Sequence, residues 1–96
     1  MHNISITDLD REKNIQIIDV REKYEYDNGS ITNINIPMGE ILKSTDKIDK
    51  LKKVVVFCQT GRRASAVAHI LRTKYNFKNI VNLTGGYQAY LNYKLN

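Results

Sequence analysis

The chain has 96 residues, of which 42% are hydrophobic and 26% charged, and its formal net charge is +5. This length suits one small globular domain and leaves no room for a second. No apolar stretch reaches the roughly 18 residues of a transmembrane helix, and the N-terminus lacks the basic and apolar segments of a secretory signal. A single cysteine forms no internal disulfide, so we expect a reducing, cytoplasmic compartment.

The positive charge is dispersed along the chain and belongs to no recognised nucleic-acid-binding motif. We therefore expect neither a nucleic acid nor a membrane as partner. A general positive potential does favour small anionic substrates. No cluster of cysteines and histidines has the spacing of metal ligands, so we expect no metal and no cofactor.

The first half of the chain is predicted to alternate between short strands and short helices. Residues 3–7 form a candidate edge strand, and "IQIIDV" at 15–20 is a continuous apolar run typical of a strand covered on both faces. "REKYEYDNG" at 21–29 is predicted to be a short helix ended by its Asn-Gly pair. Residues 33–37 form a further short strand ended by proline, and residues 39–51 hold one or two helical turns.

The second half of the chain contains the clearest elements. "KVVVFC" at 53–58 is the strongest strand, and "ASAVAHILRTKY" at 64–75 places its apolar residues on one helical stripe. Residues 79–83 form a shorter strand, and residues 85–95 form a final helix opened by a glycine pair. The alternation of strand and helix predicts an α/β three-layer domain with a mostly parallel sheet.

The stretch "FCQTGRRASAV" at 57–67 lies where the strongest strand passes into the clearest helix. Binding sites of parallel sheets lie beyond the carboxyl ends of the strands. Gly61 permits a tight turn, and successive N–H groups at a helix N-terminus form a cradle for anions. The helix dipole together with Arg62 and Arg63 lowers the pKa of a nearby thiol. We therefore predict that Cys58 is a reactive nucleophile, although a cysteine at the end of a core strand is by position alone more often inert.

Three classes of cysteine enzyme fit this loop poorly. Cysteine phosphatases and arsenate reductases need a Cys-x5-Arg loop, whereas Cys58 and Arg63 form a Cys-x4-Arg loop. Thiol–disulfide enzymes need a second cysteine, which the chain lacks. A Cys–His hydrolase needs a histidine partner, but His2 is terminal and His69 is predicted to face the surface. The remaining chemistry is attack on a sulfane sulfur, which leaves a persulfide on the cysteine.

Four segments resemble, in order and spacing, the single-domain rhodanese (thiosulfate sulfurtransferase-like) family. They are "IIDVREKYEYDNGSI" (17–31), "NINIP" (33–37), "VVVFCQTGRRASAVAHIL" (54–71) and "NLTGGYQAYL" (82–91). The resemblance implies one rhodanese domain over residues 1–96, with a five-stranded, mostly parallel sheet and helices on both faces. It also implies a sulfurtransferase that takes a sulfane sulfur from thiosulfate or a persulfide and passes it to cyanide, a thiol or an acceptor protein.

The resemblance also assigns roles within the loop. Cys58 is the nucleophile and sulfur carrier, and the backbone N–H groups that follow it hold the terminal sulfur. The side chains of Gln59 and Arg62 are expected to meet the substrate, whereas Arg63 either meets it or braces the loop through a carboxylate. The expected substrate-binding residues are Gln59, Thr60, Gly61, Arg62 and Arg63.

Supporting residues and departures from the family pattern lie outside the loop. Asp19 and Arg21 of "DVRE" are expected to order neighbouring loops by hydrogen bonds rather than to contact the substrate. Ser30 stands where the family commonly has histidine, Asn33-Ile34 where it has Gly-Ala, and Tyr90 where it frequently has tryptophan. None of these departures removes the active loop. The surface near residues 29–34 is either adapted to a partner or has changed without a functional reason.

Other functions on the same fold stay open at this point. One is a binding module without catalysis, although such modules often lack the cysteine that this chain has. Another is a sulfur relay whose donor and acceptor are proteins or small thiols. A phosphatase or arsenate reductase is disfavoured by the length of the loop. The sequence names neither the physiological donor and acceptor nor the oligomeric state.

Overall fold

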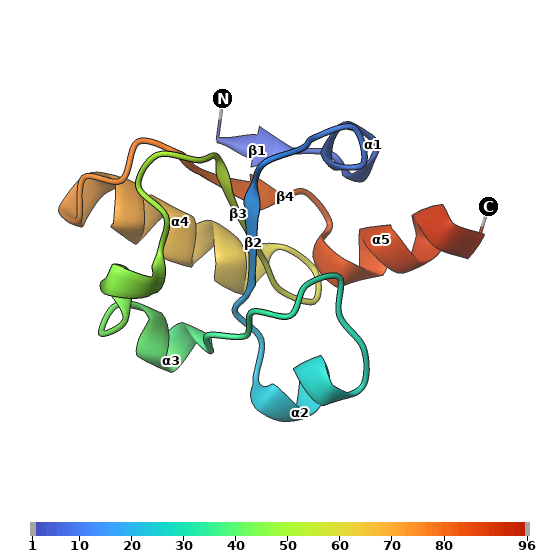
Figure 1. Ribbon diagram of the computed structural model, residues 1–96. Helices are drawn as coiled ribbons and strands as arrows, with labels where there is room; N and C mark the ends of the chain where they lie inside the picture. The colour runs from blue at the N-terminus through green and yellow to red at the C-terminus, as the bar shows by residue number, and fades with distance from the viewer. Residues whose placement is uncertain (1, 96) are drawn as a thin grey trace.

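The computed structural model describes residues 2–95, in which short strands alternate with helices as predicted (Figure 1). The elements in chain order are β1 (Asn3–Ile4), α1 (Ile6–Leu9), β2 (Gln16–Asp19), α2 (Lys23–Asp27), α3 (Met38–Ile41), the 3-10 turn η1 (Thr45–Lys47), β3 (Val54–Phe57), α4 (Arg62–Lys74), β4 (Ile80–Leu83) and α5 (Gly86–Leu95).

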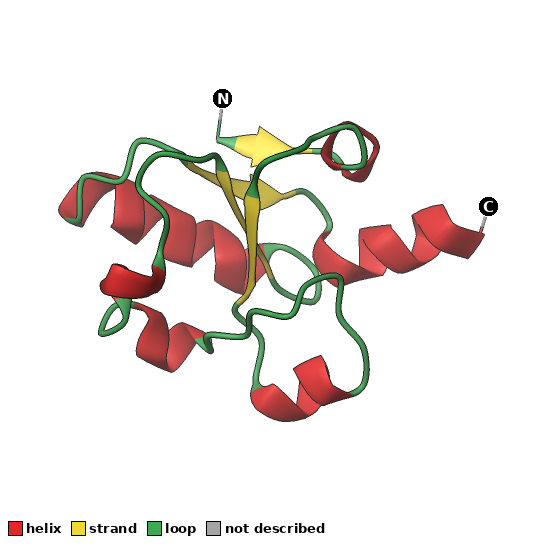
Figure 2. Cartoon of the chain, viewed as in Figure 1, coloured by secondary structure: helices red, strands yellow, loops and turns green. Residues whose placement is uncertain are grey.

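The strands of the described residues form one parallel sheet in the order β1-β4-β3-β2 (Figure 2). Strand β3 is central, with Val55 paired to Ile17 of β2 on one side and to Val81 of β4 on the other. The parallel arrangement brings the carboxyl ends of all these strands to one edge of the sheet. The predicted fold class is confirmed, with four strands in place of the expected five.

The missing strand is the predicted segment 33–37, which contributes only an isolated bridge between Asp19 and Asn35. The side chain of Asn35 turns back and donates hydrogen bonds to the carbonyl oxygens of Asp19 and Arg21. Pro37 is then the N-cap of α3, so the chain turns into a helix directly after the bridge. The segment therefore lies along β2 without becoming a full strand.

The predicted strand 3–7 is shorter than expected because a helix begins inside it. The Oγ of Ser5 accepts a hydrogen bond from the N–H of Asp8, which caps the N-terminus of α1. Strand β1 is therefore confined to Asn3–Ile4. The other predicted elements are present with boundaries that differ by a few residues.

The core lies on both faces of the sheet, because successive residues of β3 point to opposite sides. Val54 and Val56 pack with the apolar stripe of α4 and with Ile41 of α3. Val55 and Phe57 pack on the other face with residues of α1 and with Tyr87 of α5. This double burial explains the continuous apolar run of β3 and confirms the predicted three layers (Figure 2).

Candidate active site

Cys58 follows β3 at the carboxyl edge of the sheet, and 1% of its surface is exposed. Its Sγ accepts hydrogen bonds from the N–H of Gly61 at 3.1 Å and from the N–H of Ala64 at 3.3 Å. Ala64 lies in the first turn of α4, so the sulfur lies at the positive end of the helix dipole. Both donors and the dipole stabilise negative charge on the sulfur, as a nucleophilic thiolate requires.

Gly61 gives the loop its turn. It is the N-cap of α4 and has a φ of 105°, in the left-handed region that L side chains rarely adopt. A Cβ at this position would point toward the end of β4, 3.4 Å from the backbone nitrogen of Gly85 and 3.6 Å from the carbonyl oxygen of Leu83. These are ordinary contact distances, so it is the positive φ of the turn, rather than a lack of space, that requires glycine here.

The N-terminus of α5 holds the loop from its other side. The N–H of Tyr87 donates to the carbonyl oxygen of Cys58 at 2.8 Å, and the N–H of Gln88 donates to that of Gln59 at 3.0 Å. This close approach needs Gly86, whose φ is 60° and whose Cβ would lie 2.8 Å from the carbonyl carbon and oxygen of Gln59. The second glycine of "TGG" thus positions the backbone of the nucleophile, a role that the sequence pattern did not specify.

Asp19 and Arg21 form a buried ion pair at the end of β2, with 0% and 2% of their side chains exposed. The guanidinium of Arg21 donates to both carboxylate oxygens of Asp19, with its shortest bond at 2.8 Å from Nη2 to Oδ2. The hydroxyl of Ser30 donates to the same carboxylate at 2.9 Å. Ser30 thus fills part of a polar network at the position where the sequence departs from the family pattern.

Arg21 connects this network to the loop that carries the cysteine. Its Nη1 donates to Oε1 of Gln59 at 3.1 Å, and its Nη2 donates to the carbonyl oxygen of Gly29 at 2.6 Å. The guanidinium carbon also lies 4.4 Å from the ring centroid of Tyr87. These contacts are of the loop-ordering kind expected for Arg21. That Arg21 orders these loops rather than contacts the substrate stays a prediction.

Arg63 forms a bidentate ion pair with Glu25 of α2, at 2.8 Å from Nη1 to Oε1 and 2.9 Å from Nη2 to Oε2. The hydrogen bonds from Arg63 hold the pKa of the Glu25 carboxyl below its ordinary value, and the carboxylate in turn raises the pKa of Arg63. Pairing with a carboxylate is one of the two roles that the sequence leaves open for Arg63, and the sequence does not identify Glu25 as the partner. A contact between Arg63 and the substrate stays a prediction.

The remaining candidates lie at the rim of the loop or away from it. Thr60 and Arg62 are exposed beside Cys58, where a substrate can reach them. His2 and His69 are exposed, as predicted. Among the described residues, no group of three or more histidine, cysteine or acidic side chains is arranged to hold a metal ion, and no helix is long and apolar enough to cross a membrane.

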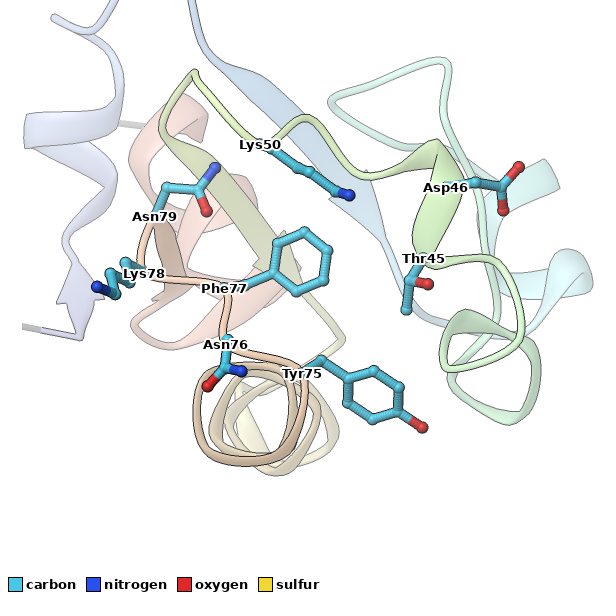
Figure 3. Close-up of a pocket in the computed structure, with 8 residues that line it drawn as sticks. All are labelled: Thr45, Asp46, Lys50, Tyr75, Asn76, Phe77, Lys78 and Asn79. Carbon is cyan, nitrogen blue, oxygen red and sulfur yellow. The ribbon is translucent and has the colours of Figure 1, made fainter.

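A separate pocket of about 520 Å³ lies near the amino ends of β3 and β4, and Figure 3 shows the side chains that line it. Tyr75 and Phe77, which follow α4, line it together with Thr45 and Lys50 from the segment before β3. These residues precede β3 and β4, whereas Cys58 follows β3. The pocket is therefore remote from the thiol and does not belong to the site built around it.

Comparison with known proteins gives consistent matches. The family model of the Rhodanese-like domain matches residues 5–93. The thiosulfate sulfurtransferase GlpE of Coxiella burnetii is 31% identical over 84 residues, which cover 86% of this chain and 78% of that protein. A Bacillus subtilis protein, YrkF, named provisionally as a sulfur carrier, is 30% identical over 79 residues. This match covers 81% of the chain but only 42% of YrkF, less than half of its length.

A solved structure of a related protein has the same fold. The crystal structure of a rhodanese-related protein from Thermoplasma volcanium superposes with a TM-score of 0.86 at 34% sequence identity. The match covers 97% of this chain and 93% of the other. The architecture described above is therefore that of the solved protein over nearly its whole length.

Proposed function

Because the chain belongs to the rhodanese-like domain family, we propose that it is a sulfurtransferase that carries sulfur as a persulfide on Cys58. The observation that carries this proposal is the environment of the Cys58 sulfur. It accepts hydrogen bonds from two backbone N–H groups, in a loop that leads directly into α4. The names of the related thiosulfate sulfurtransferases support the same chemistry.

The first half-reaction loads the enzyme. The thiolate of Cys58 attacks the outer sulfur of thiosulfate, a bond forms between the two sulfur atoms, and the sulfur–sulfur bond of thiosulfate breaks. Sulfite leaves with the bonding electron pair. The backbone N–H groups of residues 59–63 hold the negative terminal sulfur, and the positive charge of Arg62 attracts the anionic donor.

The second half-reaction removes the sulfur from the enzyme. A thiophilic acceptor such as cyanide or a thiolate attacks the outer sulfur of the persulfide, and the sulfur–sulfur bond to Cys58 breaks. The electron pair of that bond returns to Cys58 as the thiolate. The transferred sulfur leaves as thiocyanate or as a new persulfide, so the cycle balances without a cofactor or an external oxidant.

A phosphatase or arsenate reductase is a weaker candidate, because the loop from Cys58 to Arg63 is one residue short for a tetrahedral oxyanion. A protein-to-protein sulfur relay uses the same chemistry and differs only in its partners. We place the reaction in the cytoplasm, since an unpaired thiol carrier needs a reducing compartment.

The test is turnover of thiosulfate and cyanide, measured as thiocyanate formed. The wild type should turn over, and Cys58→Ala should lose turnover because no atom remains to carry the sulfur. An aryl phosphate ester is the second substrate to assay. Hydrolysis of the ester without any formation of thiocyanate would show that the protein is a phosphatase and that the proposal is wrong.

A further inference from the structure

Two backbone N–H groups of the cysteine loop have no partner within the described chain. Gly61 and Ala64 donate theirs to the sulfur of Cys58. The N–H groups of Gln59 and Thr60 donate to no acceptor among the described residues. Backbone donors are nearly always paired in native proteins. Two free donors directly after the nucleophile are therefore available to a group that arrives with the substrate.

The N-terminus of α5 determines where these two donors point. The N–H of Tyr87 donates to the carbonyl oxygen of Cys58. The N–H of Gln88 donates to the carbonyl oxygen of Gln59, so both carbonyl groups face α5. In a planar trans peptide the C=O and N–H groups point in opposite directions. The N–H groups of Gln59 and Thr60 belong to these same two peptides, so they point away from α5.

The sulfur lies on the side to which these N–H groups point. Helices α4 and α5 pack on opposite faces of the sheet (Figure 1). The hydrophobic cluster on one face contains Cys58 together with the apolar stripe of α4. Tyr87 of α5 packs against the cluster on the other face. A second sulfur atom bonded to Sγ of Cys58 is therefore on the side of the free N–H groups.

The side chain of Gln59 is held from the same side as its carbonyl group. A guanidinium has only donors, so the amide oxygen of Gln59 faces Arg21, whose Nη1 donates to it at 3.1 Å. Arg21 is fixed in turn by its ion pair with Asp19 and lies over the ring of Tyr87. We call Arg21, Tyr87 and Gln88 the rear brace, because they hold the first two peptides of the loop on the side away from the sulfur.

We propose that the rear brace makes the loop stabilise the persulfide more than the thiolate. The N–H groups of Gly61 and Ala64 stabilise the thiolate sulfur. Those of Gln59 and Thr60, which the brace orients, stabilise the outer sulfur that the persulfide adds. The brace residues are positioning residues, since they act through the loop and do not touch the reacting atoms. This inference rests on the proposed sulfurtransferase function and concerns the sulfur-loaded state of the same site.

The test measures the equilibrium constant of loading, in which the thiolate and thiosulfate give the persulfide and sulfite. Intact-mass spectrometry gives the fraction of protein that carries the extra sulfur at fixed ratios of sulfite to thiosulfate. Gln88→Pro removes the N–H that holds Gln59, in the first turn of α5 where proline is tolerated, and Gln88→Ala keeps it. The constant should be about tenfold lower for Gln88→Pro than for Gln88→Ala, which is the loss of one hydrogen bond to a charged group.

A second variant tests the side-chain part of the rear brace. Gln59→Met removes the acceptor of Arg21 at a half-buried position and should lower the same constant. An equilibrium constant does not depend on how tightly thiosulfate binds before it reacts, so a lost contact with thiosulfate cannot produce this result. The rate at which iodoacetamide alkylates Cys58 reports on the thiolate. It should stay within about twofold in all three variants, because the donors to the thiolate are unchanged.

The two measurements separate the possible outcomes. A loading constant that stays at its reference value in Gln88→Pro or in Gln59→Met would overturn the inference and leave the sulfurtransferase intact. Equal losses of loading and of alkylation would also overturn it, because the brace would then support the whole loop rather than the persulfide. If Gln88→Pro does not fold, Gln59→Met decides by the same two measurements. A wild type that gains no sulfur from any donor would instead overturn the proposed function.

Discussion

The ion pair between Arg63 and Glu25 connects the loop of Cys58 to a helix that lies 38 residues earlier in the chain. Arg63 directly follows the first residue of α4, so a change in its position displaces the backbone that surrounds the sulfur. Glu25 itself has 18% of its side chain exposed and does not touch the cysteine within the described contacts. We therefore treat Glu25 as a positioning residue for the loop.

Glu25→Gln should lower kcat/KM with thiosulfate by about tenfold, because a loop displaced by a fraction of an ångström no longer aligns its donors. Glu40→Gln, which removes an exposed carboxylate of α3, is the matched control and should leave kcat/KM unchanged. Unfolding in urea distinguishes a positioning role from a general loss of structure. An unchanged kcat/KM in Glu25→Gln would show that the pair does not position the loop.

The same pair predicts a pH dependence of stability. Arg63 holds the pKa of the Glu25 carboxyl below its ordinary value of 4.5, so the unfolded chain binds the proton more readily than the folded one. The stabilisation by the pair is therefore complete above pH 4.5 and is lost as the pH falls through the lowered pKa. The difference in unfolding free energy between the wild type and Glu25→Gln should shrink over this acidic range. A difference that grows toward low pH would contradict the assignment.

The buried pair of Asp19 and Arg21 is expected to matter for stability. Asp19→Asn leaves the guanidinium of Arg21 buried without its counter-charge, which should lower the free energy of unfolding by about 3 kcal/mol. The control is Asp27→Asn, which breaks an exposed ion pair with Lys23. It should change the free energy of unfolding by less than about 0.5 kcal/mol. Urea denaturation measures both. Equal effects of the two substitutions would mean that the network around Asp19 adds no stability.

At the scale of elements, the start of α5 determines where the nucleophile's backbone lies. Gly86→Ala should lower the free energy of unfolding by more than about 2 kcal/mol, since alanine at a positive φ is strained and its methyl group meets Gln59. Gly39→Ala is the control, because its Cβ meets nothing within 4 Å, and alanine in a helix gains up to about 1 kcal/mol. Thermal unfolding of the two variants gives the comparison. A Gly86→Ala protein as stable as the wild type would show that α5 does not need to approach the loop.

The sequence predicts the elements best where one physical signal dominates. The run "KVVVFC" becomes β3 because every one of its strand residues is buried, and the stripe of α4 faces the core as its period requires. The segments 3–7 and 33–37 fail because single side chains intervene. The hydroxyl of Ser5 starts a helix, and the carbonyl oxygen of Arg21 accepts a hydrogen bond from the side-chain amide of Asn35 where a continued strand would offer a backbone N–H.

At the scale of the molecule, the site is assembled from three segments that only the fold brings together. The loop of Cys58 was predictable, since strand, glycine, arginines and helix follow one another within a few residues. Glu25 as the partner of Arg63 was not predictable, nor were the amides of α5 on the carbonyl groups of Cys58 and Gln59. The periodicity of apolar residues shows which residues share a face of one helix or strand. These contacts join different elements, so they depend on how the helices pack over the sheet.

The central claim is that Cys58 carries the transferred sulfur, and intact-mass spectrometry tests it most directly. After incubation with thiosulfate, the wild type should gain one sulfur atom, about 32 Da, and lose it again on addition of cyanide or dithiothreitol. Cys58→Ala should show no gain. A wild-type protein that gains no such mass from thiosulfate or from glutathione persulfide would contradict the claim.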